Sequence, residues 1–277
     1  MSLSAAYDCC RQIARRHYEN FPVGSLLVPR RLRPHFYALY AYCRVSDDLG
    51  DEGDEAGRAR ALEAWEEELR GALSGRAAGP VLTALADTAS RFDIPHQLFF
   101  DLLRAFKQDQ EKRRYRSEQE LLGYCRYSAN PVGRMVLYLA GAATDRNLQL
   151  SDCVCTGLQL ANFCQDVSVD LTKGRVYFPL DDLLECSYSE VDLAAGVQND
   201  AFARLMRLQC ARARSFLLRG MPLARSLPFR LGLEIRLICL GGLRILEKVE
   251  ASGPLVLAHR PALAPLDFAG MLVRLAW

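Results

Sequence analysis

Two pairs of aspartates are the residues in this sequence most able to do chemistry. Asp47 and Asp51 lie in FYALYAYCRVSDDLGD, and Asp166 and Asp170 lie in LQLANFCQDVSVD. Residues four apart on an α-helix project from one face, one turn apart. Like charges at this spacing repel each other, and a bound cation removes that penalty. A lone pair of this kind usually marks a solvated helix face, so the case for a site depends on the neighbouring residues.

Each aspartate pair extends into a polar stripe at helical spacing. Tyr40, Arg44 and Asp48 accompany the first pair, and Gln159 and Asn162 precede the second. Carboxylate and amide oxygens without His or Cys favour a hard cation, of which Mg²⁺ is the usual one. Because Mg²⁺ keeps waters and commonly binds phosphate, the two stripes predict a phosphorylated ligand, most simply a diphosphate.

A basic segment, Lys173-Gly174-Arg175, follows the second pair directly. The guanidinium of Arg175 could grip phosphate oxygens with two parallel hydrogen bonds. Equally, Arg175 could be a charge at a helix C-terminus that Gly174 ends. Other kinds of site are disfavoured, because the sequence has no Glu-x-x-His pair, no glycine-rich nucleotide loop and no Gly-x-Ser-x-Gly.

The elements that must position these residues are helices. Apolar residues recur with helical period along the chain, and alternating, strand-like runs are nearly absent. No linker or repeat divides the sequence, so we expect one all-α domain over residues 1–277. The pattern predicts helices over residues 3–18, 31–49, 58–73, 81–91, 96–109, 118–127, 131–143, 151–171, 201–219, 229–250 and 264–277.

Composition disfavours several classes of protein. The chain has 277 residues and a formal net charge of +2, so it lacks the field that attracts nucleic acid. Its 10 cysteines form no C-x-x-C pair and no zinc pattern, so we expect reduced thiols. The first residues do not resemble a signal peptide, and no apolar run is long enough to span a bilayer. We therefore expect a cytoplasmic protein.

Four segments resemble the squalene/phytoene synthase family, in the family's order along the chain. They are YALYAYCRVSDDLGDE (37–52), RYRSEQELLGYC (114–125), YSANPVGRMV (127–136) and LQLANFCQDVSVDLTKGRVYFP (158–179). The resemblance implies a helical bundle of the trans-isoprenoid synthase type with a central apolar cavity. It also implies that two or three Mg²⁺ ions help to ionise an allylic or cyclopropylcarbinyl diphosphate.

The resemblance assigns roles to individual residues. It implies catalytic roles for Asp47, Asp51, Asp166, Asp170, Tyr40 and Tyr124. The implied metal ligands are Asp47, Asp48, Asp51, Asn162, Asp166 and Asp170. The implied contacts to the diphosphate or prenyl chain are Arg44, Gln159, Asn162, Arg175, Ala129, Val132 and Gly133. Alternatives stay open, because Tyr40 and Tyr124 could be core aromatics, Gly133 could permit close helix packing, and Ala129 could merely fill space.

Two shorter segments narrow the resemblance to one branch. ENFPVGS (19–25) and SANPVG (128–133) are similar to bacterial hydroxysqualene (squalene) synthases of the hopanoid pathway. This branch converts presqualene diphosphate to hydroxysqualene with water, so NADPH is not expected. Three alternatives stay open: condensation of two farnesyl diphosphates to presqualene diphosphate, dehydrosqualene or squalene; a phytoene-type reaction on C20 diphosphates; and a non-catalytic assembly or lipid-binding relative.

The partners implied are a prenyl diphosphate substrate and, as candidates, other enzymes of the hopanoid pathway. The C-terminal segment APLDFAGMLVRLAW (264–277) could dock on the inner membrane face as a peripheral anchor. The alternative is a terminal helix that packs on the core.

Overall fold

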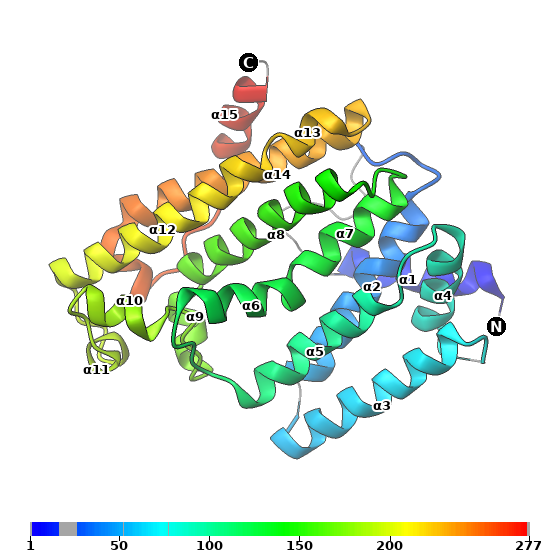
Figure 1. Cartoon of the computed structure of the whole chain (residues 1–277), viewed down its shortest axis with the longest axis horizontal. Coiled ribbons are helices and arrows are strands. Elements are labelled where there is room, and N and C mark those ends of the chain that lie inside the picture. The colour runs from blue at the N-terminus through cyan, green and yellow to red at the C-terminus, as the bar shows by residue number, and fades with distance from the viewer. Residues whose placement is uncertain (1, 17–26, 52, 77, 276–277) are drawn as a thin grey trace.

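The computed structural model describes residues 2–16, 27–51, 53–76 and 78–275, and every regular element in them is a helix (Figure 1). The predicted all-α class is confirmed. The hopanoid-type segment of residues 19–25 lies outside the described residues. In chain order the helices are α1 (Leu3–Arg16), α2 (Arg33–Asp51), α3 (Glu55–Leu73), α4 (Pro80–Arg91), α5 (Gln97–Glu111), α6 (Glu118–Ser128), α7 (Asn130–Leu139), α8 (Asp145–Gln165), α9 (Val167–Thr172), α10 (Leu180–Glu185), α11 (Glu190–Ala194), α12 (Asp200–Gly220), α13 (Leu223–Ser226), α14 (Phe229–Ser252), the short 3₁₀ helix η1 (Gly253–Leu257) and α15 (Pro265–Leu275).

Helix α8 packs against α7, α12 and α14, so it lies inside the bundle (Figure 1). Its closest neighbour is α12, and two glycines make that approach feasible. A Cβ on Gly157 would lie 2.8 Å from the backbone nitrogen of Leu217, and one on Gly220 would lie 2.7 Å from that of Val154. Because side chains at these positions would force the helices apart, the glycines set where α8 stands.

Helix α2 packs against α1, α3, α4 and α5, and its buried face fixes its rotation. The Tyr42 hydroxyl donates a hydrogen bond to the Phe99 carbonyl at 2.8 Å. One turn later, the Trp65 indole donates to the Ser46 hydroxyl at 3.0 Å. With Tyr42 and Ser46 turned inward, the residues offset by half a turn, including Tyr40 and Arg44, face the other way.

The predicted helix over residues 151–171 is wrong in two respects. It starts earlier, because the Thr144 side chain accepts a hydrogen bond from the Asn147 backbone and caps α8. It also breaks at Asp166, whose φ and ψ of −100° and 13° end α8 before α9 begins. The Asp170 backbone nitrogen still donates to the Asp166 carbonyl at 2.8 Å, so the spacing of one turn is kept.

An apolar cavity of about 350 Å³ lies between α2, α7, α8 and α14. Its lining is mostly aliphatic and aromatic, with Phe36, Leu39 and Ile238 among the residues that form it, and Ser151 and Glu234 are its polar members. The expected central apolar cavity is therefore present.

The structure also bears on the cysteines, on membrane-spanning helices and on the C-terminal helix. All ten cysteines are free thiols. None of the helices within the described ranges is long and apolar enough to cross a bilayer. Helix α15 packs on α14, where its buried Asp267 forms ion pairs with Arg244 and Lys248. Its Leu266 and Val273 are exposed, and docking on a membrane stays a prediction.

Candidate active site

The first aspartate motif occupies the last turns of α2, on the face opposite Tyr42. Arg44 lies one turn before it, 3.3 Å from Asp47 through Nη1, and forms a second ion pair with Asp48. Burial and the nearby Asp51 carboxylate raise the pKa of Asp47 above its ordinary value. The motif therefore holds more negative charge than Arg44 neutralises.

The second motif straddles the break between α8 and α9. Burial and the neighbouring Asp166 carboxylate raise the pKa of Asp170 to about 7. Asp166 forms an ion pair with Arg260, whose Nη2 lies 3.4 Å from its second oxygen. The Gln165 side chain donates to the Pro261 carbonyl at 2.6 Å, which holds the Arg260 segment against the motif. Nothing in the sequence indicated Arg260, because it lies 94 residues from Asp166 in an irregular segment.

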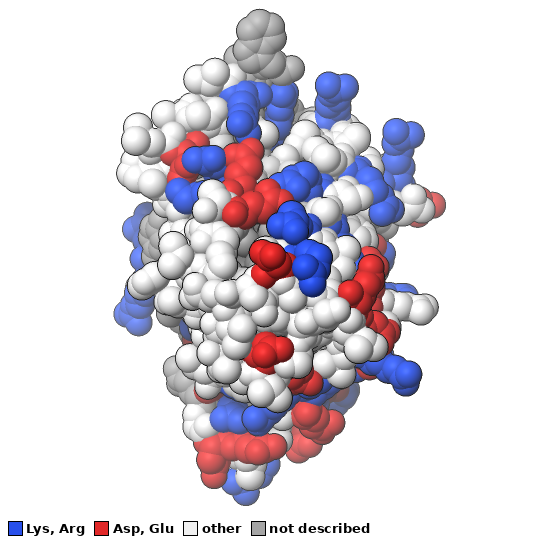
Figure 2. Space-filling model, turned by 90° about the vertical axis from the view of Figure 1, so that its left-hand side faces the viewer, with Lys and Arg blue, Asp and Glu red and all other residues white. Residues whose placement is uncertain are grey.

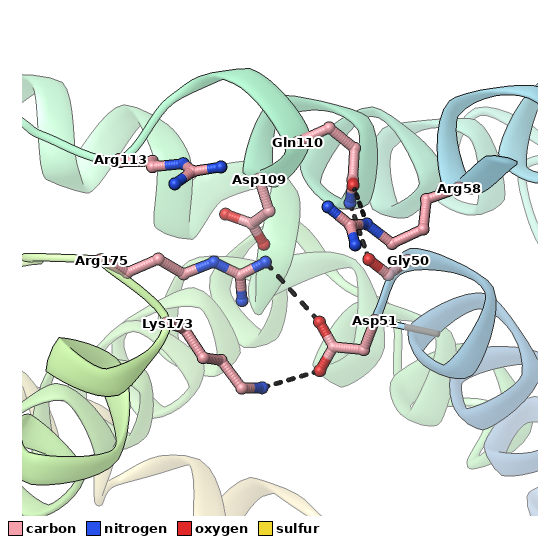
Figure 3. A pocket seen from close by; sticks show the side chains of 8 residues that line it. All are labelled: Gly50, Asp51, Arg58, Asp109, Gln110, Arg113, Lys173 and Arg175. Atoms are coloured by element: carbon pink, nitrogen blue, oxygen red, sulfur yellow. Dashed lines mark hydrogen bonds and ion pairs between the residues drawn. The ribbon is translucent and has the colours of Figure 1, made fainter. Parts of the chain in front are cut away.

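Lys173 and Arg175 join the two motifs. Lys173 Nζ lies 2.8 Å from one oxygen of Asp51, and Arg175 Nη2 lies 3.6 Å from the other (Figure 3). Gly174 between them has a φ of 69°, which ends α9 and turns the chain back toward α2. Burial alone would raise the pKa of Asp51, but Lys173 and the nearby arginines bring it below its ordinary value. Gly174 thus ends the helix, as one interpretation expected, while Arg175 faces the cleft.

Asp109 on α5 lies in the same region and was missed from the sequence. Its carboxylate accepts a hydrogen bond from the Tyr124 hydroxyl at 2.7 Å. Burial raises the pKa of Asp109 to about 6, although Tyr124 and Arg175 oppose that shift. Asp109 belongs to a polar stretch, KQDQEKRRY, in which no spacing separates it from its neighbours. Only the fold brings it to the site.

Tyr124 is both a core aromatic and a site residue. Its ring is buried with those of Tyr115, Phe163 and Tyr177, and Phe163 stacks on Tyr177 with centroids 4.0 Å apart. Its hydroxyl reaches Asp109. The two interpretations of Tyr124 are therefore compatible.

The remaining predicted residues lie on α2, α8 and around α7, and only some of them line the apolar cavity. Tyr40, Val132 and Gly133 line the cavity. Ala129 caps both α6 and α7 and is not among the residues that line the cavity. On α8, one to two turns before Asp166, Gln159 is half-buried and Asn162 is exposed. Since Tyr40 lines the cavity and Arg44, one turn later, pairs with the first motif, the apolar cavity and the carboxylates meet along α2.

The donor set suits Mg²⁺ in kind, because it consists of carboxylate and amide oxygens. Across the described ranges, however, no three carboxylate, His or Cys side chains converge closely enough to hold a metal by themselves. Basic side chains instead form ion pairs with Asp51 and Asp166. The raised pKa values of Asp47 and Asp170 indicate negative charge that these basic side chains do not balance. The residues fit an ion held by one or two carboxylates together with waters and a phosphate.

The raised pKa of Asp170 predicts how stability depends on pH without divalent ions. Between pH 4 and 7 the folded protein binds more protons at Asp170 than the unfolded chain does, so the contribution of Asp170 to stability falls as the pH rises through this window. Urea unfolding in EDTA should show this contribution removed in Asp170→Asn, so that the stability of the variant relative to the parent rises with pH across the window. The control is Asp181→Asn, which removes an equal charge from an exposed residue. Equal pH slopes for the two variants would contradict the buried-charge account.

Comparison with known proteins agrees with this architecture. Residues 14–267 match the family model of squalene/phytoene synthase. Phytoene synthase of Arthrospira platensis is 35% identical over 228 residues, which cover 77% of this chain and 74% of that protein. The chloroplastic phytoene synthase 1 of Zea mays is 34% identical over 77% of this chain, but the chain spans only 54% of that protein.

Among solved structures, squalene synthase HpnC from Alicyclobacillus acidocaldarius is 43% identical and has a TM-score of 0.86. The match covers 91% of this chain and 95% of that protein. The fold is accordingly that of the trans-isoprenoid synthases. The chain belongs to the squalene/phytoene synthase family, whose members process isoprenoid diphosphates.

Proposed function

We propose that the protein ionises presqualene diphosphate in the presence of Mg²⁺ and that water captures the rearranged cation to give hydroxysqualene. The observation that carries this proposal is the junction on α2. There an apolar cavity suited to a long hydrocarbon meets carboxylates and arginines suited to a diphosphate. The similarity to squalene synthase HpnC supports this branch of the family.

The first step breaks a carbon–oxygen bond, and both electrons leave with the diphosphate oxygen. Bound Mg²⁺ would supply charge neutralisation for that leaving group. Arg44 and Arg175 hold Asp48 and Asp51 in the absence of substrate. Their guanidinium groups would donate hydrogen bonds to phosphate oxygens once substrate binds.

The cation that remains needs shielding and a proton acceptor. Aromatic faces stabilise a desolvated cation by about 2 kcal/mol each, and the rings of Phe36 and Tyr40 line the apolar cavity. Addition of water to the cation yields an oxonium group that must lose a proton. The Tyr124 hydroxyl would accept this proton as it passes its own to Asp109, whose pKa of about 6 leaves it mostly ionised at neutral pH.

A second candidate is a phytoene-type condensation of C20 diphosphates. It is favoured by the identity to phytoene synthases, which reaches 35%. The same carboxylates and arginines would serve both reactions, so the choice depends on chain length and product.

The test incubates the purified protein with synthetic presqualene diphosphate and Mg²⁺, with and without NADPH. Parallel incubations use farnesyl and geranylgeranyl diphosphate. Mass spectrometry should identify hydroxysqualene from presqualene diphosphate, with no requirement for NADPH. Phytoene from the C20 substrate alone would establish the second candidate. Condensation of farnesyl diphosphate, or an absence of turnover on every substrate, would contradict the proposal.

A further inference from the structure

A second, polar pocket of about 250 Å³ is lined in part by Asp51 (Figure 3). Among the described residues, it shares no lining residue with the apolar cavity. The charged side chains that line it come from α2, α3, α5 and the turn after α9. They are Asp51, Asp109, Arg58, Arg113, Lys173 and Arg175. Among the described residues, four cations face two carboxylates, so these lining side chains carry an excess of positive charge even with both carboxylates ionised.

Two of these cations, Lys173 and Arg175, form ion pairs with Asp51. A third, Arg58, is held by hydrogen bonds. Arg58 donates from Nε to the Gln110 side chain at 2.8 Å and from Nη1 to the Gly53 carbonyl at 2.7 Å. These bonds to neutral groups fix the guanidinium without neutralising it. Arg58 therefore presents a positioned positive charge to the pocket.

The fourth cation, Arg113, has no counter-charge. In the described part of the chain its guanidinium makes no hydrogen bond or ion pair, although it lines the pocket (Figure 3). Its neighbour Arg114, by contrast, pairs with Glu190 and donates to the Gly174 carbonyl. In Figure 3 the guanidinium of Arg113 and the fixed guanidinium of Arg58 line opposite sides of the same pocket, an arrangement suited to a multivalent anion.

The pocket restricts which anion it can take. Its volume lies below the 300–1,000 Å³ range typical of sites for drug-sized ligands. None of the lining residues that the structure describes is aromatic, so these residues offer no ring on which a nucleobase or nicotinamide could stack. A small anion with several acceptor oxygens, such as a diphosphate, fits both limits.

We propose that this pocket receives the inorganic diphosphate released by ionisation, with Arg58 and Arg113 as its ligands. The inference rests on the proposed function and extends it. The diphosphate leaves with the bonding electrons, so the cation remaining in the apolar cavity can be recaptured by it. Because the described residues that line the pocket are different from those that line the cavity, a diphosphate held by Arg58 and Arg113 is kept away from the cation.

Calorimetric binding of inorganic pyrophosphate to the purified protein, with and without Mg²⁺, tests the subsite independently of turnover. Arg113→Gln should weaken binding about tenfold, and Arg113→Lys should lose less because it keeps the charge. Arg58→Gln should also weaken binding. The matched control is Arg116→Gln, an exposed arginine three residues away and outside the pocket lining, which should bind as the parent does.

The outcomes separate the two proposals. Equal pyrophosphate affinity in the parent and both Arg113 variants would overturn the subsite, even if the parent makes hydroxysqualene. Binding that depends on Arg113 would support the subsite, even if turnover on presqualene diphosphate were absent. Displacement of pyrophosphate by an equal concentration of NADPH would assign the pocket to a nucleotide phosphate and overturn the inference.

Discussion

Replacement of Asp166 by Asn is expected to lower kcat about a thousandfold while leaving the fold intact. Asp166 stands at the break between α8 and α9, where its charge helps to raise the pKa of Asp170 to about 7. The amide keeps the size of the side chain but removes a carboxylate. That carboxylate would hold the Mg²⁺ that neutralises the leaving diphosphate. Product formation from presqualene diphosphate at saturating Mg²⁺ measures the effect.

The fold should tolerate this change for two reasons. The ion pair of Asp166 with Arg260 is partly exposed, and such pairs contribute about 1 kcal/mol or less. Removal of Asp166 also relieves repulsion on Asp170. Asp152→Asn is the matched control, since Asp152 lies on α8, the helix that Asp166 ends, and its ion pair is with Arg134 of α7. Turnover of Asp166→Asn near the parental rate, with melting unchanged, would count against a role for the second motif in ionisation.

Much of the fold follows from the sequence because local pattern and burial agree. Helix α2 carries both Asp47 and Asp51, as their spacing indicated, although it runs two residues past the predicted end at residue 49. Its buried face is held by Tyr42 and Ser46. The helix over residues 131–143 was expected to be longer than it is. It ends at Leu139 because Gly141 adopts a φ of 63°, a conformation that an apolar pattern does not reveal.

The short helices α10, α11 and α13 were also missed. Each spans six residues or fewer, which is too short for a helical period to be counted. Their ends are set by local bonds instead, as in the capping box that Ser189 forms with Asp192. Turn chemistry, not hydrophobic spacing, would have been the signal to use.

The candidate site was predictable where residues share a helix and unpredictable where they do not. The four aspartates and Arg175 stand in recognisable patterns, and the structure joins them through Lys173. Asp109, Arg113 and Arg260 reach the same region from other elements, so no spacing could indicate them. On the face in Figure 2, Lys and Arg side chains lie among Asp and Glu side chains.

Replacement of Gly133 by Val is expected to lower kcat/KM about a hundredfold by obstructing the apolar cavity. Gly133 lines that cavity on α7, and a Cβ there would overlap Cys155 Sγ and Ser151 Oγ of α8. The added carbons must therefore push α7 away from α8 or enter the space that the prenyl chain needs. The loss should be greater with a C30 substrate than with a truncated diphosphate, because only the long chain reaches past the obstruction.

Two companion variants decide whether Gly133 acts on the cavity or merely on packing. Gly123→Val adds the same bulk to α6, where a Cβ would meet nothing within 4 Å, and should leave kcat/KM close to the parental value. Adding Cys155→Ala and Ser151→Ala to Gly133→Val removes both overlapping atoms. If the obstruction is steric, the triple variant should recover at least part of the lost kcat/KM on the C30 substrate. No recovery, together with a lowered melting temperature in every Gly133 variant, would mean that this glycine serves helix packing alone.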